Sequence, residues 1–138
     1  MRNRADFLAQ GVSVPPQSNY TVLIREAIHA LDRSAPAEDS EEVLLDTILR
    51  DDEADRLVMT NENFFGTPRM TMKRGQFYPE ADDRLGALRQ LFPESEIELF
   101  LAIRDPGTFI PAVHAMANSV PLHAILGESD PGTLRWSH

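Results

Sequence analysis

The chain has 138 residues, of which 42% are apolar, enough to form the core of one domain. Its 22 acidic residues outnumber its 13 basic ones and give a formal charge of -9, which argues against a general nucleic-acid-binding surface. There is no cysteine, so disulfides, thiol nucleophiles and zinc–thiolate sites are excluded. No apolar run approaches the length of a membrane span, and the N-terminus carries charges where a signal peptide is apolar. We therefore expect a soluble, cytoplasmic protein.

Three helices are predicted in the first 50 residues. The first covers Arg2–Gln10 and ends at a glycine that two prolines soon follow, which is a typical helix stop. The second covers Tyr20–Asp32 and carries an apolar stripe for an inner face. The third begins at Asp39 or Ser40, either of which can cap it, and runs to about Arg50.

The middle of the chain predicts a strand, a loop and a fourth helix. Residues 51–53 are acidic and are expected to be solvated surface, and Asp55–Asn61 is the weaker of two strand candidates. Thr67–Pro79 has no clean period and predicts a loop that is rich in methionine and basic residues and suited to cover a site. Ala81–Phe92 has helical apolar spacing and ends at a proline.

The remaining chain is organised around one apolar stretch, Glu96–Pro106, which we take as the central strand. Within Glu96–Pro106, the run Leu99–Ile103 is continuously apolar and is cut off by Arg-Asp-Pro, which favours a buried strand. A long helix is predicted to follow over Gly107–Leu126. Helix, tight turn, buried strand and helix are typical of a parallel sheet flanked by helices, so we predict an α/β fold in a single domain over residues 1–138.

Two side chains could carry chemistry at the ends of the predicted strands. Arg104 ends the central strand and precedes a helix, where an anionic ligand often binds; pairing with Asp105 or another acid is the alternative. Glu62 follows the other strand and could accept a proton, or could equally be a solvated or capping glutamate. Because parallel strands end at the same edge of a sheet, we expect Glu62 and Arg104 to form a minimal group-transfer site.

Other kinds of site find little support in the sequence. Neither a Gly-x-Ser-x-Gly turn nor a glycine-rich phosphate loop occurs. His114 and His123 are nine residues apart, a spacing that does not place both on one helix face, so no metal site is predicted.

Four segments together resemble the bacterial sulfotransferase-like proteins of the P-loop fold, in order and over most of the chain. They are Asn3–Pro15, similar to the helix after the family's phosphate loop; Thr60–Gly66, similar to its second strand end; Leu91–Pro106, similar to its strand ending in Arg-Asp-Pro; and Asp130–Ser137. The resemblance implies that Arg104 contacts the 3′-phosphate of the donor 3′-phosphoadenosine 5′-phosphosulfate (PAPS). It also implies sulfuryl transfer to a small-molecule or carbohydrate acceptor, with Glu62 nominated as the base and no metal.

The chain departs from this family in two places. The family's first strand and phosphate loop would precede Met1, so we expect a sheet that is incomplete at both ends, as in a truncated protein. The serine that joins the arginine on the 3′-phosphate is replaced by Ala112. Two functions therefore stay open: a sulfotransferase-like protein, inactive at this length, or a non-catalytic α/β interaction module. A module with exposed sheet edges is expected to form a homodimer or to pair with another chain.

Overall fold

The computed structural model describes residues 3–117 and 120–134. Its helices and two small sheets place the protein in the general α/β class. The described residues fall into two compact units: residues 3–61 and 86–96 form the first, and residues 62–85, 97–117 and 120–134 form the second. The single domain over residues 1–138 stays a prediction.

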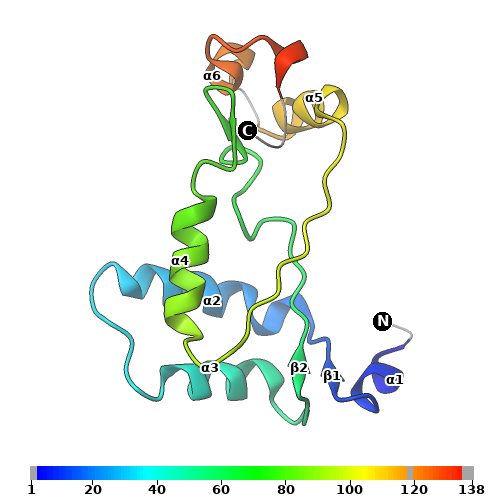
Figure 1. Ribbon diagram of the computed structural model, residues 1–138, viewed down its shortest axis with the longest axis vertical. Helices are drawn as coiled ribbons and strands as arrows, with labels where there is room; N and C mark the ends of the chain where they lie inside the picture. Colours follow the sequence, from blue (N-terminus) through cyan, green and yellow to red (C-terminus); the bar gives the residue numbers. More distant parts are fainter. Residues whose placement is uncertain (1–2, 118–119, 135–138) are drawn as a thin grey trace. The chain divides into compact units, whose positions relative to one another are not determined.

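The first unit is mainly helical. In chain order it contains α1 (Arg4–Leu8), β1 (Val12–Ser13), η1 (Gln17–Asn19), α2 (Thr21–Leu31), α3 (Ser40–Leu49), β2 (Arg56–Leu57) and the second half of α4 (Ala81–Leu91) (Figure 1). The predicted helices are confirmed, with ends within two residues of those expected. Asp39 takes the N-cap position of α3 but makes no capping hydrogen bond through its side chain. The buried apolar side chains of this unit are Tyr20, Ile24, Leu44, Ile48, Leu91 and Phe92.

A two-stranded parallel sheet lies in the first unit. β1 pairs with β2 in the register Val12 to Arg56 and Ser13 to Leu57. The pairing continues beyond both strands, since the Gly11 carbonyl accepts from the Arg56 amide and the Ser13 carbonyl from the Val58 amide. β1 is not predicted by the sequence, because the glycine and the two prolines around it indicate the end of a helix and no strand. The other strand candidate, Asp55–Asn61, is confirmed only over β2.

A buried tyrosine fixes the chain that leaves β2. Tyr20 has no exposed surface, and its hydroxyl donates to the Thr60 carbonyl at 2.7 Å and accepts from the Thr60 amide at 2.9 Å. One phenol thus satisfies both backbone polar groups of a residue that has no strand beside it.

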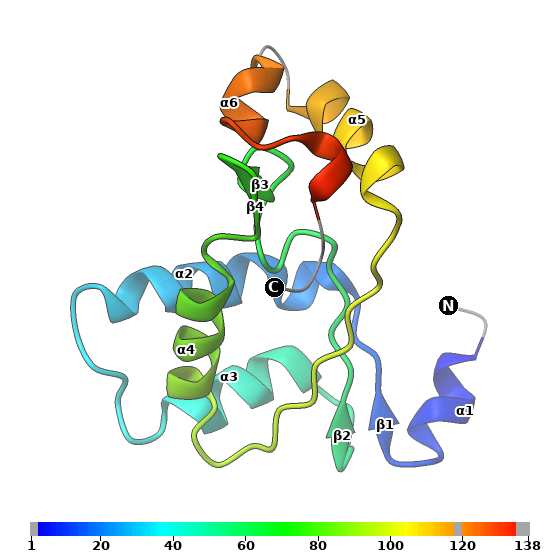
Figure 2. The same ribbon diagram turned by 45° about the horizontal axis from the view of Figure 1, so that its top comes forward.

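The second unit is built on a hairpin and two helices. It contains β3 (Met72–Lys73), β4 (Gln76–Phe77), the first half of α4, α5 (Pro106–Met116), α6 (Leu122–Leu126) and η2 (Pro131–Thr133) (Figure 2). β3 and β4 pair antiparallel around Arg74 and Gly75, which both have positive φ, as in a two-residue type I′ turn. The prediction of an unstructured loop over Thr67–Pro79 is therefore wrong at its centre.

The hairpin and α6 share an apolar core. Met72 packs in one buried cluster with Ile110, Ile125, Leu126 and Leu134. The Gly75 amide donates to the Ile125 carbonyl at 2.9 Å, and a Cβ on Gly75 would lie 2.0 Å from the Ser129 hydroxyl oxygen. The hairpin turn thus needs glycine for its conformation and also for its close approach to the chain after α6.

The long helix predicted over Gly107–Leu126 is two helices. α5 ends at Met116, and Pro121 takes the N-cap position of α6 with an extended backbone. Proline has no amide hydrogen and disfavours helical geometry in the residue before it, so a continuous helix would be broken there. Apolar spacing continued across the break and concealed it. The segment 135–138, with Trp136, lies outside the described residues.

The central strand predicted within Glu96–Pro106 is absent. Residues 96–105 form neither helix nor strand, and Figure 1 shows the chain between α4 and α5 as an extended trace. The apolar side chains of this stretch are exposed instead of buried. The prediction of a buried strand is wrong here, because no strand among the described residues pairs with this stretch.

We predict that Tyr20→Phe destabilises the protein through loss of its two hydrogen bonds to Thr60. A net hydrogen bond contributes about 0.5–1.5 kcal/mol, so the free energy of unfolding should fall by about 1–2 kcal/mol in urea denaturation. Ser18→Ala, an exposed residue in η1, is the control. An unchanged urea midpoint for Tyr20→Phe would show that the Thr60 contacts contribute nothing.

Candidate functional site

Arg104 lies at the entrance to α5. Its side chain is exposed, and it precedes Asp105, the N-cap residue of α5. The Asp105 carbonyl accepts hydrogen bonds from the amides of Thr108 and Phe109 at 3.1 and 3.0 Å, which starts the helix. Arg104 therefore directly precedes the N-cap residue of an 11-residue helix, as the sequence predicted, but it does not end a strand.

Glu62 lies in a turn after β2 and is exposed. Among the described residues, no hydrogen bond or ion pair involves its carboxylate, so none joins it to Arg104. We expected Glu62 and Arg104 to meet because two neighbouring parallel strands would end beside each other. One of those strands is missing, so a shared group-transfer site of Glu62 and Arg104 stays a prediction.

One hollow in each unit of the described structure is lined by neither Glu62 nor Arg104. The hollow in the first unit has a volume of about 350 Å³ and lies between the end of α2, the following loop and α3. The hollow in the second unit, of about 310 Å³, lies between α5, α6 and η2, with His114 as its one ionisable lining residue. Both are walled mainly by apolar side chains, which suits packing of an apolar group better than binding of a phosphate.

Arg69, in the predicted basic loop, makes a structural contact with α5. Its Nε donates to the carbonyl of Ala117, the C-cap residue of α5, at 3.1 Å. A cation at the C-terminal end of a helix is favoured by the helix dipole. Arg69 therefore caps a helix, while Lys73 and Arg74 stay exposed on the hairpin.

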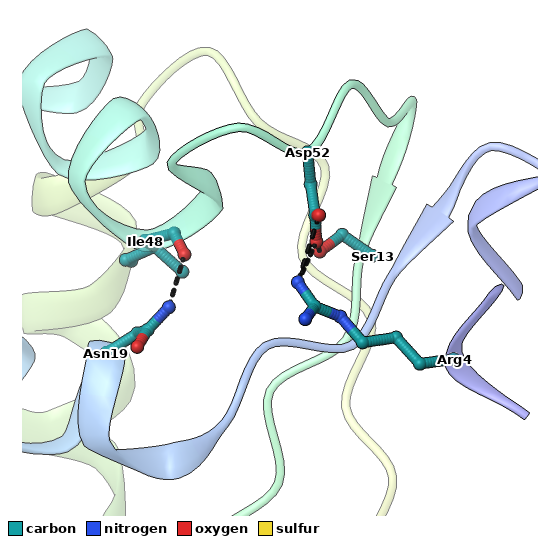
Figure 3. Close-up of polar contacts among 5 residues, drawn as sticks. All are labelled: Arg4, Ser13, Asn19, Ile48 and Asp52. Carbon is teal, nitrogen blue, oxygen red and sulfur yellow. Dashed lines mark hydrogen bonds and ion pairs between the residues drawn. The ribbon is translucent and has the colours of Figure 1, made fainter. Parts of the chain in front are cut away.

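An ion pair that the sequence did not reveal ties α1 to the sheet of the first unit. One nitrogen of Arg4 lies 2.9 Å from each carboxylate oxygen of Asp52, and the Ser13 hydroxyl donates to the same carboxylate at 2.6 Å (Figure 3). The hydrogen bond from Ser13, and secondarily that from Arg4, holds the pKa of Asp52 below its usual value. A carboxylate with a lowered pKa is a weak base, so this cluster is suited to stability and not to activating Ser13 as a nucleophile.

A buried carboxylate holds the start of the exposed apolar stretch. Glu41 is only 9% exposed and accepts hydrogen bonds from the Glu94 amide and the Ser95 hydroxyl. Its spacing to Leu44 and Ile48 places it on the inner face of α3, a signal that the sequence contained. Glu41 therefore fixes two residues that lie shortly before residue 97 in the sequence.

The most unusual surface feature is that stretch itself, Ile97–Ile103, which we call the apolar segment. Its large side chains are 36–89% exposed: Ile97 36%, Leu99 54%, Phe100 89%, Leu101 60% and Ile103 59%. No hydrogen bond to the backbone of these residues occurs within the described part of the chain. An extended, apolar segment with open amides and carbonyls is a template for pairing with another strand. The apolar segment is therefore our candidate functional site.

No protein-family model, curated protein or solved structure matches this chain. Within residues 3–117 and 120–134, no helix combines the length and the apolar character needed to cross a bilayer. The same residues contain no group of three or more histidine and acidic side chains placed to hold a metal ion.

We predict that the stabilisation from Asp52 depends on pH. Its pKa is lowered by folding, so the stabilisation is present above the ordinary value of 3.8 and is lost as the pH falls through the lowered pKa. The thermal midpoint of Asp52→Asn should lie below that of the wild type at neutral pH, and the two should converge in acid. Asp51→Asn, an exposed neighbour, is the control. A gap between wild type and Asp52→Asn that does not narrow in acid would contradict this role.

Proposed function

We propose that the protein is an interaction module that binds a partner by strand addition through the apolar segment. The observation that carries this proposal is the exposure of five large apolar side chains on a stretch whose backbone has no hydrogen-bonded partner in the described chain. In strand addition, backbone hydrogen bonds give affinity and alternating side chains give specificity. The apolar segment offers both kinds of contact.

The magnitudes show that binding through the apolar segment needs both its side chains and its backbone. Burying a Leu, Ile or Phe side chain fully contributes about 1.5–3 kcal/mol, so burying the exposed parts of these five would contribute about 4–9 kcal/mol. Association itself costs about 4–15 kcal/mol. Side-chain burial alone therefore gives weak binding, and the backbone hydrogen bonds of a paired strand would add the remainder.

The apolar segment continues into hydrogen-bonded chain on both sides, which lowers the cost of binding relative to a free tail. Glu41 fixes Glu94 and Ser95 before it, and the first hydrogen bonds of α5 fix Asp105 after it. A segment joined to such chain at both ends loses less conformational entropy when it pairs than a free tail does. This supports a role as a presented strand.

We predict that strand-forming peptides bind the apolar segment. Peptides selected from a random displayed library on the immobilised protein should alternate apolar and polar residues. Leu99→Lys combined with Leu101→Lys should weaken their binding by about tenfold or more, because burying a lysine charge among apolar side chains is costly. Leu122→Lys, an exposed leucine of α6, is the matched control. Failure to select any such peptide, or equal binding to both variants, would contradict the proposal.

A second candidate function is sulfuryl transfer in a P-loop sulfotransferase-like fold, with PAPS as the donor. The position of Arg104 favours it, since an exposed arginine that directly precedes the N-cap residue of α5 suits a phosphate. Ala112, in the second turn of α5, supplies no hydroxyl for the same phosphate. Glu62 would be the base toward a small-molecule or carbohydrate acceptor.

The donor-binding role of Arg104 is tested by calorimetric titration with PAPS. If Arg104 holds the 3′-phosphate, Arg104→Ala should bind about tenfold or more weakly, since a hydrogen bond to a charged group contributes about 1.5–3 kcal/mol. Arg89→Ala, an exposed arginine of α4, should bind as the wild type does. No saturable binding, or equal affinity of wild type and Arg104→Ala, would exclude this function.

A further inference from the structure

We infer that the partner of the apolar segment is the same segment of a second copy of this chain, paired antiparallel about Phe100. This inference rests on the proposed strand addition and names its partner. Apart from Glu98, which falls opposite Ala102, the apolar segment carries like residues when it is read in the reverse direction. Ile97 then lies opposite Ile103, Leu99 opposite Leu101, and Phe100 lies on the twofold axis.

Charge at the two ends selects the antiparallel direction. Glu96 precedes the apolar segment and Arg104 follows it, and both are exposed. In the antiparallel pair, Glu96 of each copy lies opposite Arg104 of the other, which forms two favourable cross-strand pairs. In a parallel pair, like charges would face each other at both ends. A guanidinium has five N–H donors, so Arg104 can receive Glu96 of the second copy beside other partners.

The alternation of side chains suits such a ribbon. Residues 97, 99, 101 and 103 are all Ile or Leu and would lie on one face, because successive side chains of a strand point to opposite faces. The other face would carry Phe100 at its centre and the charged residues toward its rims. Pairing therefore satisfies the open backbone groups and gathers the aliphatic side chains of both copies on a single face.

The affinity follows from the size of this contact. A pair of seven-residue strands is small beside the interfaces of stable dimers, so we expect a dimer whose population depends on protein concentration. Sedimentation velocity over a concentration series should show a shift from monomer to dimer. Leu99→Lys with Leu101→Lys should abolish the shift, and Leu122→Lys should leave it unchanged.

Charge reversal tests the pairing of Glu96 with Arg104. Glu96→Arg alone and Arg104→Glu alone each replace two favourable pairs by two repulsive ones, so each should weaken dimerisation about tenfold or more. The double variant Glu96→Arg/Arg104→Glu restores opposite charges and should recover the wild-type dimer. Recovery by the double variant also shows that these substitutions have not simply unfolded the chain. A double variant as weak as the single ones would overturn the pairing.

Cysteine cross-linking tests the direction, because the chain contains no cysteine. Ile97→Cys and Ile103→Cys should not form disulfide dimers separately under mild oxidation, but an equimolar mixture should, since directly opposite residues lie within disulfide distance. A disulfide dimer of Ile97→Cys alone would indicate parallel pairing and overturn the inference.

The two proposals fail in different ways. A chain that stays monomeric at all concentrations, yet binds selected strand peptides through Leu99 and Leu101, overturns the second copy as partner and retains strand addition. A chain that neither dimerises nor binds such peptides overturns both.

Discussion

The structure depends on one constraint: backbone amides and carbonyls of an extended segment need partners, and apolar side chains need cover. In Ile97–Ile103, the backbone groups have no hydrogen-bonded partner and the large apolar side chains are exposed within the described chain. The parallel sheet of the first unit is small, since β1 and β2 pair over two residues each. Two-stranded sheets are marginal alone. Here the sheet is supported by side chains, through Tyr20 on Thr60 and through Arg4 and Ser13 on Asp52.

A single buried carboxylate fixes the last residues of the first unit, which precede the apolar segment in the sequence. Glu41 lies on the inner face of α3 with Leu44 and Ile48 and holds the turn at Glu94 and Ser95. A buried carboxylate without partners is costly, so these hydrogen bonds are needed for the packing of α3 as well as for the direction of the chain. The same contact therefore stabilises α3 and fixes the residues that precede the apolar segment.

The sequence predicted the first four helices well, merged α5 and α6 into one helix, and predicted the sheets poorly. Helical spacing and end signals are local, so α2, α3 and α4 were found within two residues. The apolar run at Leu99–Ile103 is typical of a buried strand. The run alone does not indicate whether another strand is present to pair with it. The hairpin turn at Arg74 and Gly75 lacks the Asn-Gly or Asp-Gly signal that identifies such turns.

The candidate site was predicted only in part. Arg104 was correctly expected before a helix, whereas its partnership with Glu62 required a strand that the structure does not contain. The contacts of Asp52 with Arg4 and Ser13 join residues 48 and 39 positions apart, and no local pattern reports such pairs. Glu41 was detectable from its place on an apolar helix face.

The central claim is that the apolar segment forms a strand only when a second copy meets it. Amide hydrogen exchange of residues 97–103, followed across a range of protein concentrations, tests it most directly, because exchange slows when an amide becomes hydrogen-bonded. These amides should exchange fast in dilute protein, and alternate amides along the apolar segment should become protected as the concentration rises. Fast exchange at every concentration would contradict it.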